Sequence, residues 1–219
     1  MAVFQADALV LRSREYGEAD RILTLFSREY GKIEAVAKGV RRPASKQRGG
    51  TQLFTYADFL LHRGRTLATV QQAQPRESFP HLWGDWEKSR AAAIMAELLD
   101  AVTVREEPAA ELFRLTLAGF FLIAAVEPDL LITAYALKTL EAQGHWSAAA
   151  SDSPDAPLGP GSRAMLRRLL LTPPEQLDRL RWSREMRDEI VPFVRRWAET
   201  RLERRLAAWN LTIEIPCRP

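Results

Sequence analysis

Five basic residues lie close together near the start of the chain, in the segment VAKGVRRPASKQRGG at 36–50. They are Lys38, Arg41, Arg42, Lys46 and Arg48, and the nearest acidic residues are Glu34 before them and Asp58 after them. Each cation could neutralise one phosphate of a polyanion, and the three glycines of the segment would let its backbone approach the polymer. The segment therefore predicts an anion-binding loop; the alternative is a solvated surface loop.

More candidate contacts precede this loop. Arg12 and Arg14 end the first predicted strand, and Tyr16, which follows them, could stack on a base. A single tyrosine more often packs against its own protein, so that alternative stays open. Arg63 and Arg65 could extend the positive track or mark an exposed hairpin.

Residues suited to catalysis or metal binding are few and scattered. The three histidines, His62, His81 and His145, have no partners at metal-site or nucleophile spacing, and Cys217 is the only cysteine. Most acidic residues fall on predicted helix faces, where solvation explains them. We therefore expect no enzyme activity, no metal and no cofactor.

The charge of the chain is unevenly distributed. The net charge is +3, but residues 1–80 hold 13 Lys or Arg against 8 Asp or Glu, and residues 81–219 hold 18 against 20. A localised positive region favours a polyanionic partner. Since the sequence shows no secretory signal and no apolar run of about 18 residues, it predicts a cytoplasmic protein without a membrane partner.

The hydrophobic pattern predicts strands first and helices afterwards. Residues 1–75 contain five short apolar segments separated by glycine and polar turns, which is typical of a small β-barrel. We expect a connector at 76–87, with Pro75 and Pro80 as breakers, and an α-helical domain at 88–219. Within it we expect Asp129 as an N-cap, a Pro/Gly-rich loop at 147–161 and a last helix over 183–209 that is kinked or broken at Pro192.

Loops between the strands of small barrels commonly bind oligonucleotides. The basic residues do not lie on a candidate recognition helix, and no zinc-finger pattern is present. Binding of a single strand through phosphate contacts, sensitive to salt and largely blind to base sequence, fits these observations better than reading of a duplex.

The sequence also resembles the bacterial recombination mediator family RecO. The resemblance lies in ALVLRSREYGEADRILTLFSREYGKIEAVAKGVRR, with Tyr-x-Glu-x-Asp at Tyr16, Glu18 and Asp20 and the stretch AKGxR before the basic loop, followed by LFTYADFLLHRG. It implies an α+β multidomain protein in which an N-terminal OB-fold barrel precedes a helical domain. It also implies binding and annealing of single- and double-stranded DNA, nucleoid association, and RecA loading with RecR on DNA coated by single-strand-binding protein. Lys38, Arg41 and Arg42 match the family's DNA-contacting cations.

Two departures from this family are visible. Many members carry a four-cysteine zinc module where this chain has the cysteine-free segment 147–161. Relatives often carry arginines for the acidic tail of single-strand-binding protein where this chain has Leu130, Leu131, Ile132 and Thr133. Possible substitutes, each also explicable as a solvated residue, are Arg114, Lys138, Arg167 and Arg168.

Two other functions remain open at this level. The same loop would serve an RNA-binding OB-fold protein, and the helical domain could act as an adaptor that holds an acidic peptide. The sequence leaves undetermined the oligomeric state, the preference for DNA or RNA, and the surfaces that would contact RecR and single-strand-binding protein.

Overall fold

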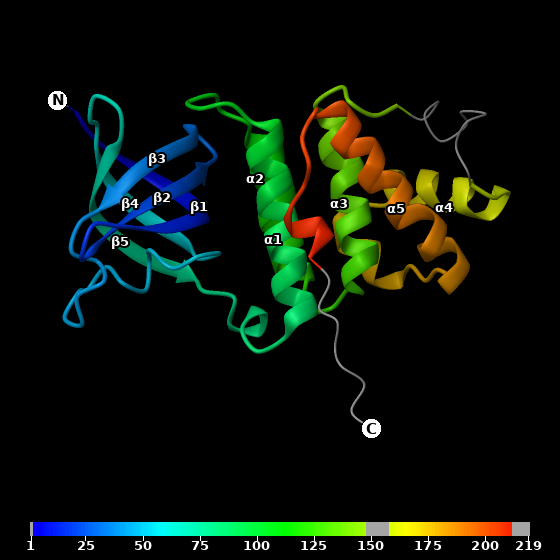
Figure 1. Ribbon diagram of the computed structural model, residues 1–219, viewed down its shortest axis with the longest axis horizontal. Helices are drawn as coiled ribbons and strands as arrows, with labels where there is room; N and C mark the ends of the chain where they lie inside the picture. Colours follow the sequence, from blue (N-terminus) through cyan, green and yellow to red (C-terminus); the bar gives the residue numbers. More distant parts are fainter. Residues whose placement is uncertain (1, 148–157, 212–219) are drawn as a thin grey trace.

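The protein consists of a five-stranded barrel followed by a bundle of helices (Figure 1), seen in a computed structural model that describes residues 2–147 and 158–211. The strands close in the order β1-β2-β3-β5-β4. All neighbours are antiparallel except β3 and β5, where Ala35 pairs with Ala68 and Val36 with Thr69. The strands are β1 (Val3–Tyr16), β2 (Asp20–Ser27), β3 (Gly31–Ala37), β4 (Tyr56–His62) and β5 (Ala68–Glu77).

Alternation of buried and partly exposed residues forms the barrel interior. In β3 and β4 every second residue is buried, which places Ile33, Ala35, Phe59 and Leu61 inside. The long strand β1 pairs with β4 along its first half and with β2 along its second, and its register shifts between Val10 and Arg12. Such a bulge bends a strand, so β1 can belong to both sides of the closed barrel.

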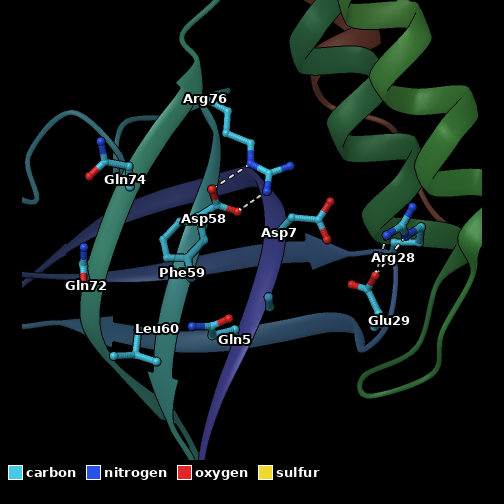
Figure 2. Close-up of a pocket in the computed structure, with 11 residues that line it drawn as sticks. Gln5, Asp7, Arg28, Glu29, Asp58, Phe59, Leu60, Gln72, Gln74 and Arg76 are labelled. Carbon is cyan, nitrogen blue, oxygen red and sulfur yellow. Dashed lines mark hydrogen bonds and ion pairs between the residues drawn. The ribbon is translucent and has the colours of Figure 1, made fainter.

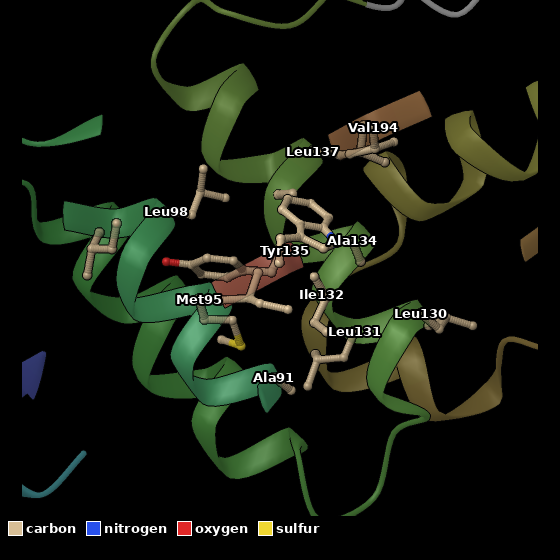
Figure 3. Packing of buried hydrophobic residues seen from close by; sticks show 14 of the residues in the cluster. Ala91, Met95, Leu98, Leu130, Leu131, Ile132, Ala134, Tyr135, Leu137 and Val194 are labelled. Carbon is tan, nitrogen blue, oxygen red and sulfur yellow. The ribbon is translucent and has the colours of Figure 1, made fainter. Parts of the chain in front are cut away.

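The helical part is built around one central helix, α3, whose residues from Leu130 to Leu137 are all buried (Figure 3). A helix that is apolar on all sides needs neighbours on all sides. The Tyr135 hydroxyl shares a 2.9 Å hydrogen bond with Thr116, and burial raises the pKa of Tyr135 to about 12. The helices are η1 (Pro80–Leu82), α1 (Trp86–Val102), α2 (Ala110–Leu122), α3 (Pro128–Ala142), α4 (Pro160–Leu171), η3 (Pro174–Arg179), α5 (Arg184–Arg201) and η4 (Ala208–Asn210).

One apolar core lies between the barrel and the helices, and a separate one fills the inside of the barrel. Leu9, Leu11, Phe26 and Phe54 belong to the same cluster of buried residues as the side chains of α1, α2 and α3. Polar contacts join the two parts as well: Lys32 Nζ on β3 lies 2.8 Å from Asp100 Oδ1 on α1. The barrel is therefore packed directly on the helices (Figure 1).

The order of strands and then helices is confirmed, but four local predictions were wrong. Pro75 does not break the strand but lies within β5. β3 pairs with β5 only at residues 68 and 69, so at Pro75 only β4 is a neighbouring strand. A proline is tolerated at such an edge position. The N-cap of α3 is Glu127, whose carboxylate accepts from the N–H groups of Asp129 and Leu130. The last long helix ends at Arg201, and Pro192 lies within it without ending it. α4 already begins at Pro160, while residues 148–157 of the predicted loop, like Cys217, fall outside the described residues.

Candidate nucleic-acid interface

The basic loop, residues 38–55, begins where β3 ends and is held against the turn between β1 and β2. The Gly39 N–H donates a 2.7 Å hydrogen bond to Asp20 Oδ1, and the Arg41 N–H donates to the carbonyl oxygen of Ala19 at 2.9 Å. Gly39 has a φ of 64°, a left-handed conformation that glycine adopts at little cost. These bonds fix the first cations of the loop beside the end of β1.

The second half of the loop lies along β5. Gln47 Nε2 donates a 2.8 Å hydrogen bond to the carbonyl oxygen of Gln71. At Gly50 a Cβ atom would stand 2.8 Å from the carbonyl carbon of Ala73, so the two backbones are in direct contact. Thr51 is buried, and its hydroxyl donates to the carbonyl oxygen of Gln47 at 2.9 Å. The loop is thus an ordered segment fastened at both ends.

Four of the five loop cations remain available for a ligand. The side chains of Lys38, Arg42, Lys46 and Arg48 are exposed, and none of them forms a hydrogen bond or ion pair with any residue in the parts of the chain that the structure describes. Exposed cations without an acidic neighbour keep their charge for an external polyanion.

Two predicted contact residues are instead engaged within the protein. Arg41 lies 3.1 Å from the Glu15 carboxylate and also donates to the carbonyl oxygen of Glu18 at 3.3 Å. Arg12 forms a 3.2 Å ion pair with Asp100 on α1. Arg41 therefore fastens the loop to the β1–β2 turn, and Arg12 joins the barrel to the helices. Both are weaker candidates for phosphate binding than the sequence indicates.

Arg14 and Tyr16 lie at the same end of the barrel as the loop. Both are exposed near the end of β1, and Tyr16 pairs in register with Asp20, the residue that binds Gly39. Tyr16 is 54% exposed, and its ring could receive a base. Arg63 and Arg65 lie in the β4–β5 turn, which rises above the barrel in Figure 1 while the basic loop lies below it. They do not extend the same track.

The four cations proposed for an acidic tail do not form an equivalent site. Lys138 is partly buried and donates a hydrogen bond to the carbonyl oxygen of Leu170 at the end of α4. Partial burial lowers the pKa of Lys138, although the charges of Glu141 and Glu175 act in the opposite direction. Arg114 on α2 and Arg167 and Arg168 on α4 are exposed, and Arg167 has a partner within the protein.

A groove with a volume of about 570 Å³ lies on the outer face of β1, β4 and β5 (Figure 2). Its arginines are neutralised: Arg76 lies 2.7 Å from Asp58, and Arg28 lies 2.8 Å from Glu29. Partial burial would raise the pKa of Asp7, but a hydrogen bond from Tyr56 and the charge of Arg28 lower it below its ordinary value. With three carboxylates and two paired arginines, this groove is poorly suited to phosphates.

The sequence alone did not identify Asp20 and Gln47 as parts of the interface, and it assigned Gly50 to the approach of a polymer, whereas Gly50 lies against Ala73 of β5. Asp20, Gln47 and Gly50 bind no ligand themselves but position the loop that carries the cations. Asp20 belongs to the Tyr-x-Glu-x-Asp stretch, which marked this region. Its partner, the Gly39 N–H, is brought beside it only by the pairing of β2 with the end of β3.

Within residues 2–147 and 158–211, no three histidine, cysteine or acidic side chains come together in a way that could hold a metal ion. In the same residues, no helix combines the length and the apolar character needed to cross a bilayer. The features that stand out are therefore the barrel and its ordered cationic loop.

The fold and the loop define a class of protein: an OB-type barrel with a basic loop, followed by helices. Comparison with known proteins narrows this class. Residues 1–79 match the family description "Recombination protein O N terminal", and residues 84–145 match "Recombination protein O C terminal". The chain belongs to the RecO family.

Individual relatives agree with this assignment, two of them over nearly the whole chain. The DNA repair protein RecO of Desulfitobacterium hafniense is 45% identical over 96% of this chain and 89% of its own length. The DNA repair protein RecO of Heliobacterium modesticaldum is 35% identical over the same shares. That of Pelotomaculum thermopropionicum is 45% identical over 66% of this chain and 57% of its own length.

Proposed function

We propose that this protein binds DNA through its basic loop and anneals complementary strands in recombinational repair. The observation that carries the proposal is the set of four exposed cations, which have no partner among the described residues, on a loop that is fixed at both ends. A fixed array loses less conformational entropy on binding than a flexible one, so more of the electrostatic attraction contributes to affinity. Family membership and the names of the relatives support DNA repair as the context.

Annealing requires no covalent step, so a surface of exposed cations can be sufficient for it. Two strands must be brought together against the mutual repulsion of their phosphates, and their bases must stay free to pair. Lys38, Arg42, Lys46 and Arg48 stand on an exposed loop rather than in a closed channel. Such a surface can neutralise phosphates and leave the base edges open.

Membership of the RecO family supports a proposal for the place of this activity in repair. We propose that the protein acts with RecR on DNA coated by single-strand-binding protein and so helps to load RecA. Because apolar side chains occupy positions 130–132 near the start of α3, this protein would bind the tail of single-strand-binding protein through other residues than its relatives do. Arg114 and Arg168 are exposed and remain candidates, whereas Lys138 is bound to the end of α4.

The test of DNA binding reverses two loop charges. The double variant Arg42→Glu/Arg48→Glu is expected to lose about tenfold or more in affinity for single-stranded DNA and to show a shallower dependence on salt, since fewer counterions are released. Fluorescence anisotropy over a salt series measures both quantities. The matched control is Arg196→Glu/Arg204→Glu, which changes the net charge by the same amount as the loop variant. Both positions are exposed, Arg196 on α5 and Arg204 just after it.

Equal affinities of the two double variants would reject the loop as the binding site. An annealing assay with complementary oligonucleotides then asks whether the loop variant also loses strand pairing. Competition between DNA and RNA of equal length separates this function from an RNA-binding one: stronger competition by RNA would contradict the proposal.

A further inference from the structure

Five aromatic rings gather where the barrel meets the helices. Phe54, Phe79 and Phe120 are buried there, while Trp83 is 51% exposed and Phe121 is 52% exposed. Trp83 stacks on Phe54 with 6.3 Å between centroids, and Phe121 meets Phe79 edge-on at 5.0 Å. Phe120 contacts both buried rings, at 5.6 Å and 5.5 Å. Two half-exposed rings are thus held by three rings beneath them.

The residues that support the exposed rings have unusual backbones. Phe54 has a φ of 63° and Phe79 a φ of 45°, in the left-handed region that phenylalanine seldom adopts. Each is held there by a 2.9 Å hydrogen bond, from Phe54 N–H to the Val10 carbonyl oxygen and from Phe79 N–H to Glu77 Oε1. Strained positions of this kind persist where surrounding structure enforces them and are often found at ligand sites.

The aromatic cluster is continuous with the basic loop. Phe54 belongs to that loop, whose preceding residues lie along β5, with Gly49 beside Pro75. β5 ends at Glu77, and the chain passes through Phe79 to Trp83 at the foot of α1 (Figure 1). A strand bound along the loop therefore has a path from the cations to the exposed rings.

Nearby carboxylates are already engaged and do not repel such a strand strongly. Glu77 accepts from Phe79, and Asp85 accepts from the Lys88 N–H and lies 3.3 Å from the Lys88 ammonium group. Trp83 and Phe121 are each about half exposed although both also contact buried rings. Flat, rigid, half-exposed rings beside a phosphate-binding surface suit unpaired bases, because every base has a face that can stack.

We propose that Trp83 and Phe121 form a base-stacking platform for the single strand whose phosphates lie on the basic loop. This inference rests on the proposed function and adds that the bases of the strand bind to the two exposed rings. Because the platform offers two rings, it would hold a base or two and leave the stretch along the loop free to pair. It would therefore anchor one strand during annealing without blocking the reaction.

The test compares two ligands that differ only in their bases. Wild-type protein is expected to bind an oligothymidylate more tightly than an abasic deoxyribose-phosphate oligomer of equal length. The double variant Trp83→Ala/Phe121→Ala is expected to bind the oligothymidylate about tenfold more weakly, as for other base–aromatic contacts, and the abasic oligomer as wild type does. Its salt dependence should stay unchanged, since no cation is removed.

Further variants separate stacking from other roles. Trp83→Phe keeps a ring and should retain most of the affinity, whereas Trp83→Leu keeps an apolar side chain and should lose it. Leu171→Ala, at an exposed apolar position on α4, should have no effect. A circular-dichroism melt tests whether each variant is folded. If the double alanine variant is unfolded, the comparison of Trp83→Phe with Trp83→Leu decides whether stacking contributes to binding.

The outcomes distinguish the two proposals. If wild type binds neither ligand, or binds without dependence on the loop cations, the proposed function fails and this inference fails with it. If wild type binds with the expected salt dependence but treats both oligomers alike, or if Trp83→Leu binds as wild type, only the platform is rejected. The last result would instead indicate an apolar contact surface for another protein.

Discussion

At the scale of single residues, charge alone does not identify a binding residue. Arg41 and Arg42 are neighbours in the sequence, yet Arg41 is paired with Glu15 and Arg42 is exposed without an ion pair in the described parts of the chain. Conversely, the acidic residue Asp20 supports the cationic loop because its carboxylate binds the Gly39 N–H. A negative charge can therefore stand beside the cationic loop and position it.

Two substitutions separate the charge of Asp20 from its hydrogen bond. Asp20→Asn keeps an acceptor oxygen and removes the negative charge, so DNA affinity should stay equal to wild type or rise slightly. Asp20→Ala leaves the Gly39 N–H without its partner, which should lower the free energy of unfolding by about 1–2 kcal/mol and loosen the loop. Urea denaturation and anisotropy measure the two effects. Affinity of the alanine variant as high as that of the asparagine variant would contradict the anchoring role.

At the scale of elements, the interface depends on how the loop is seated against β5. Gly50 and Gly49 are adjacent in sequence but meet β5 differently. A Cβ atom at Gly50 would lie 2.8 Å from the carbonyl carbon of Ala73, whereas one at Gly49 would lie 3.7 Å from Pro75 Cγ, an ordinary contact. The close approach at Gly50 also explains why the loop can hydrogen-bond to the strand through Gln47.

This difference predicts unequal effects of two similar substitutions. Gly50→Ala should force the loop away from β5, lower the free energy of unfolding by about 1–3 kcal/mol and weaken DNA binding severalfold. Gly49→Ala should be tolerated in both measurements. Thermal denaturation and DNA titration of the two variants test this, and similar behaviour of both would show that contact with β5 does not hold the cations in place.

At the scale of the whole molecule, the barrel and the helices are one packed unit. Asp100 on α1 joins them by binding Lys32 at 2.8 Å and Arg12 at 3.2 Å, and its backbone carbonyl also accepts from Lys32 at 2.7 Å. The Lys32 and Asp100 side chains are each only 12% exposed. Removing one partner of a mostly buried pair leaves the other charge desolvated, so this contact affects the stability of both parts.

Asp100→Ala should therefore be strongly destabilising. We expect a loss of about 3 kcal/mol in the free energy of unfolding, because Lys32 keeps only its backbone acceptor. Asp188→Ala on α5, where the paired arginines are exposed, should change stability by less than about 1 kcal/mol. Urea denaturation of both variants provides the comparison. DNA affinity should not fall in folded Asp100→Ala protein, since Arg12 is released; a marked fall would mean that the junction itself takes part in binding.

The sequence by itself determined the local features of this protein. Five strands, the helices after them and the cluster of cations in one loop follow from alternation, helical periodicity and turn residues, which act over a few neighbouring positions. Only the tertiary structure decided which cations are available and which rings meet. Arg12 meets Asp100 because β1 packs on α1, and Phe54 meets Trp83 because the basic loop packs on the end of η1. Charge pairing and ring packing depend on distances between residues far apart in the chain, and such distances exist only once the chain has folded.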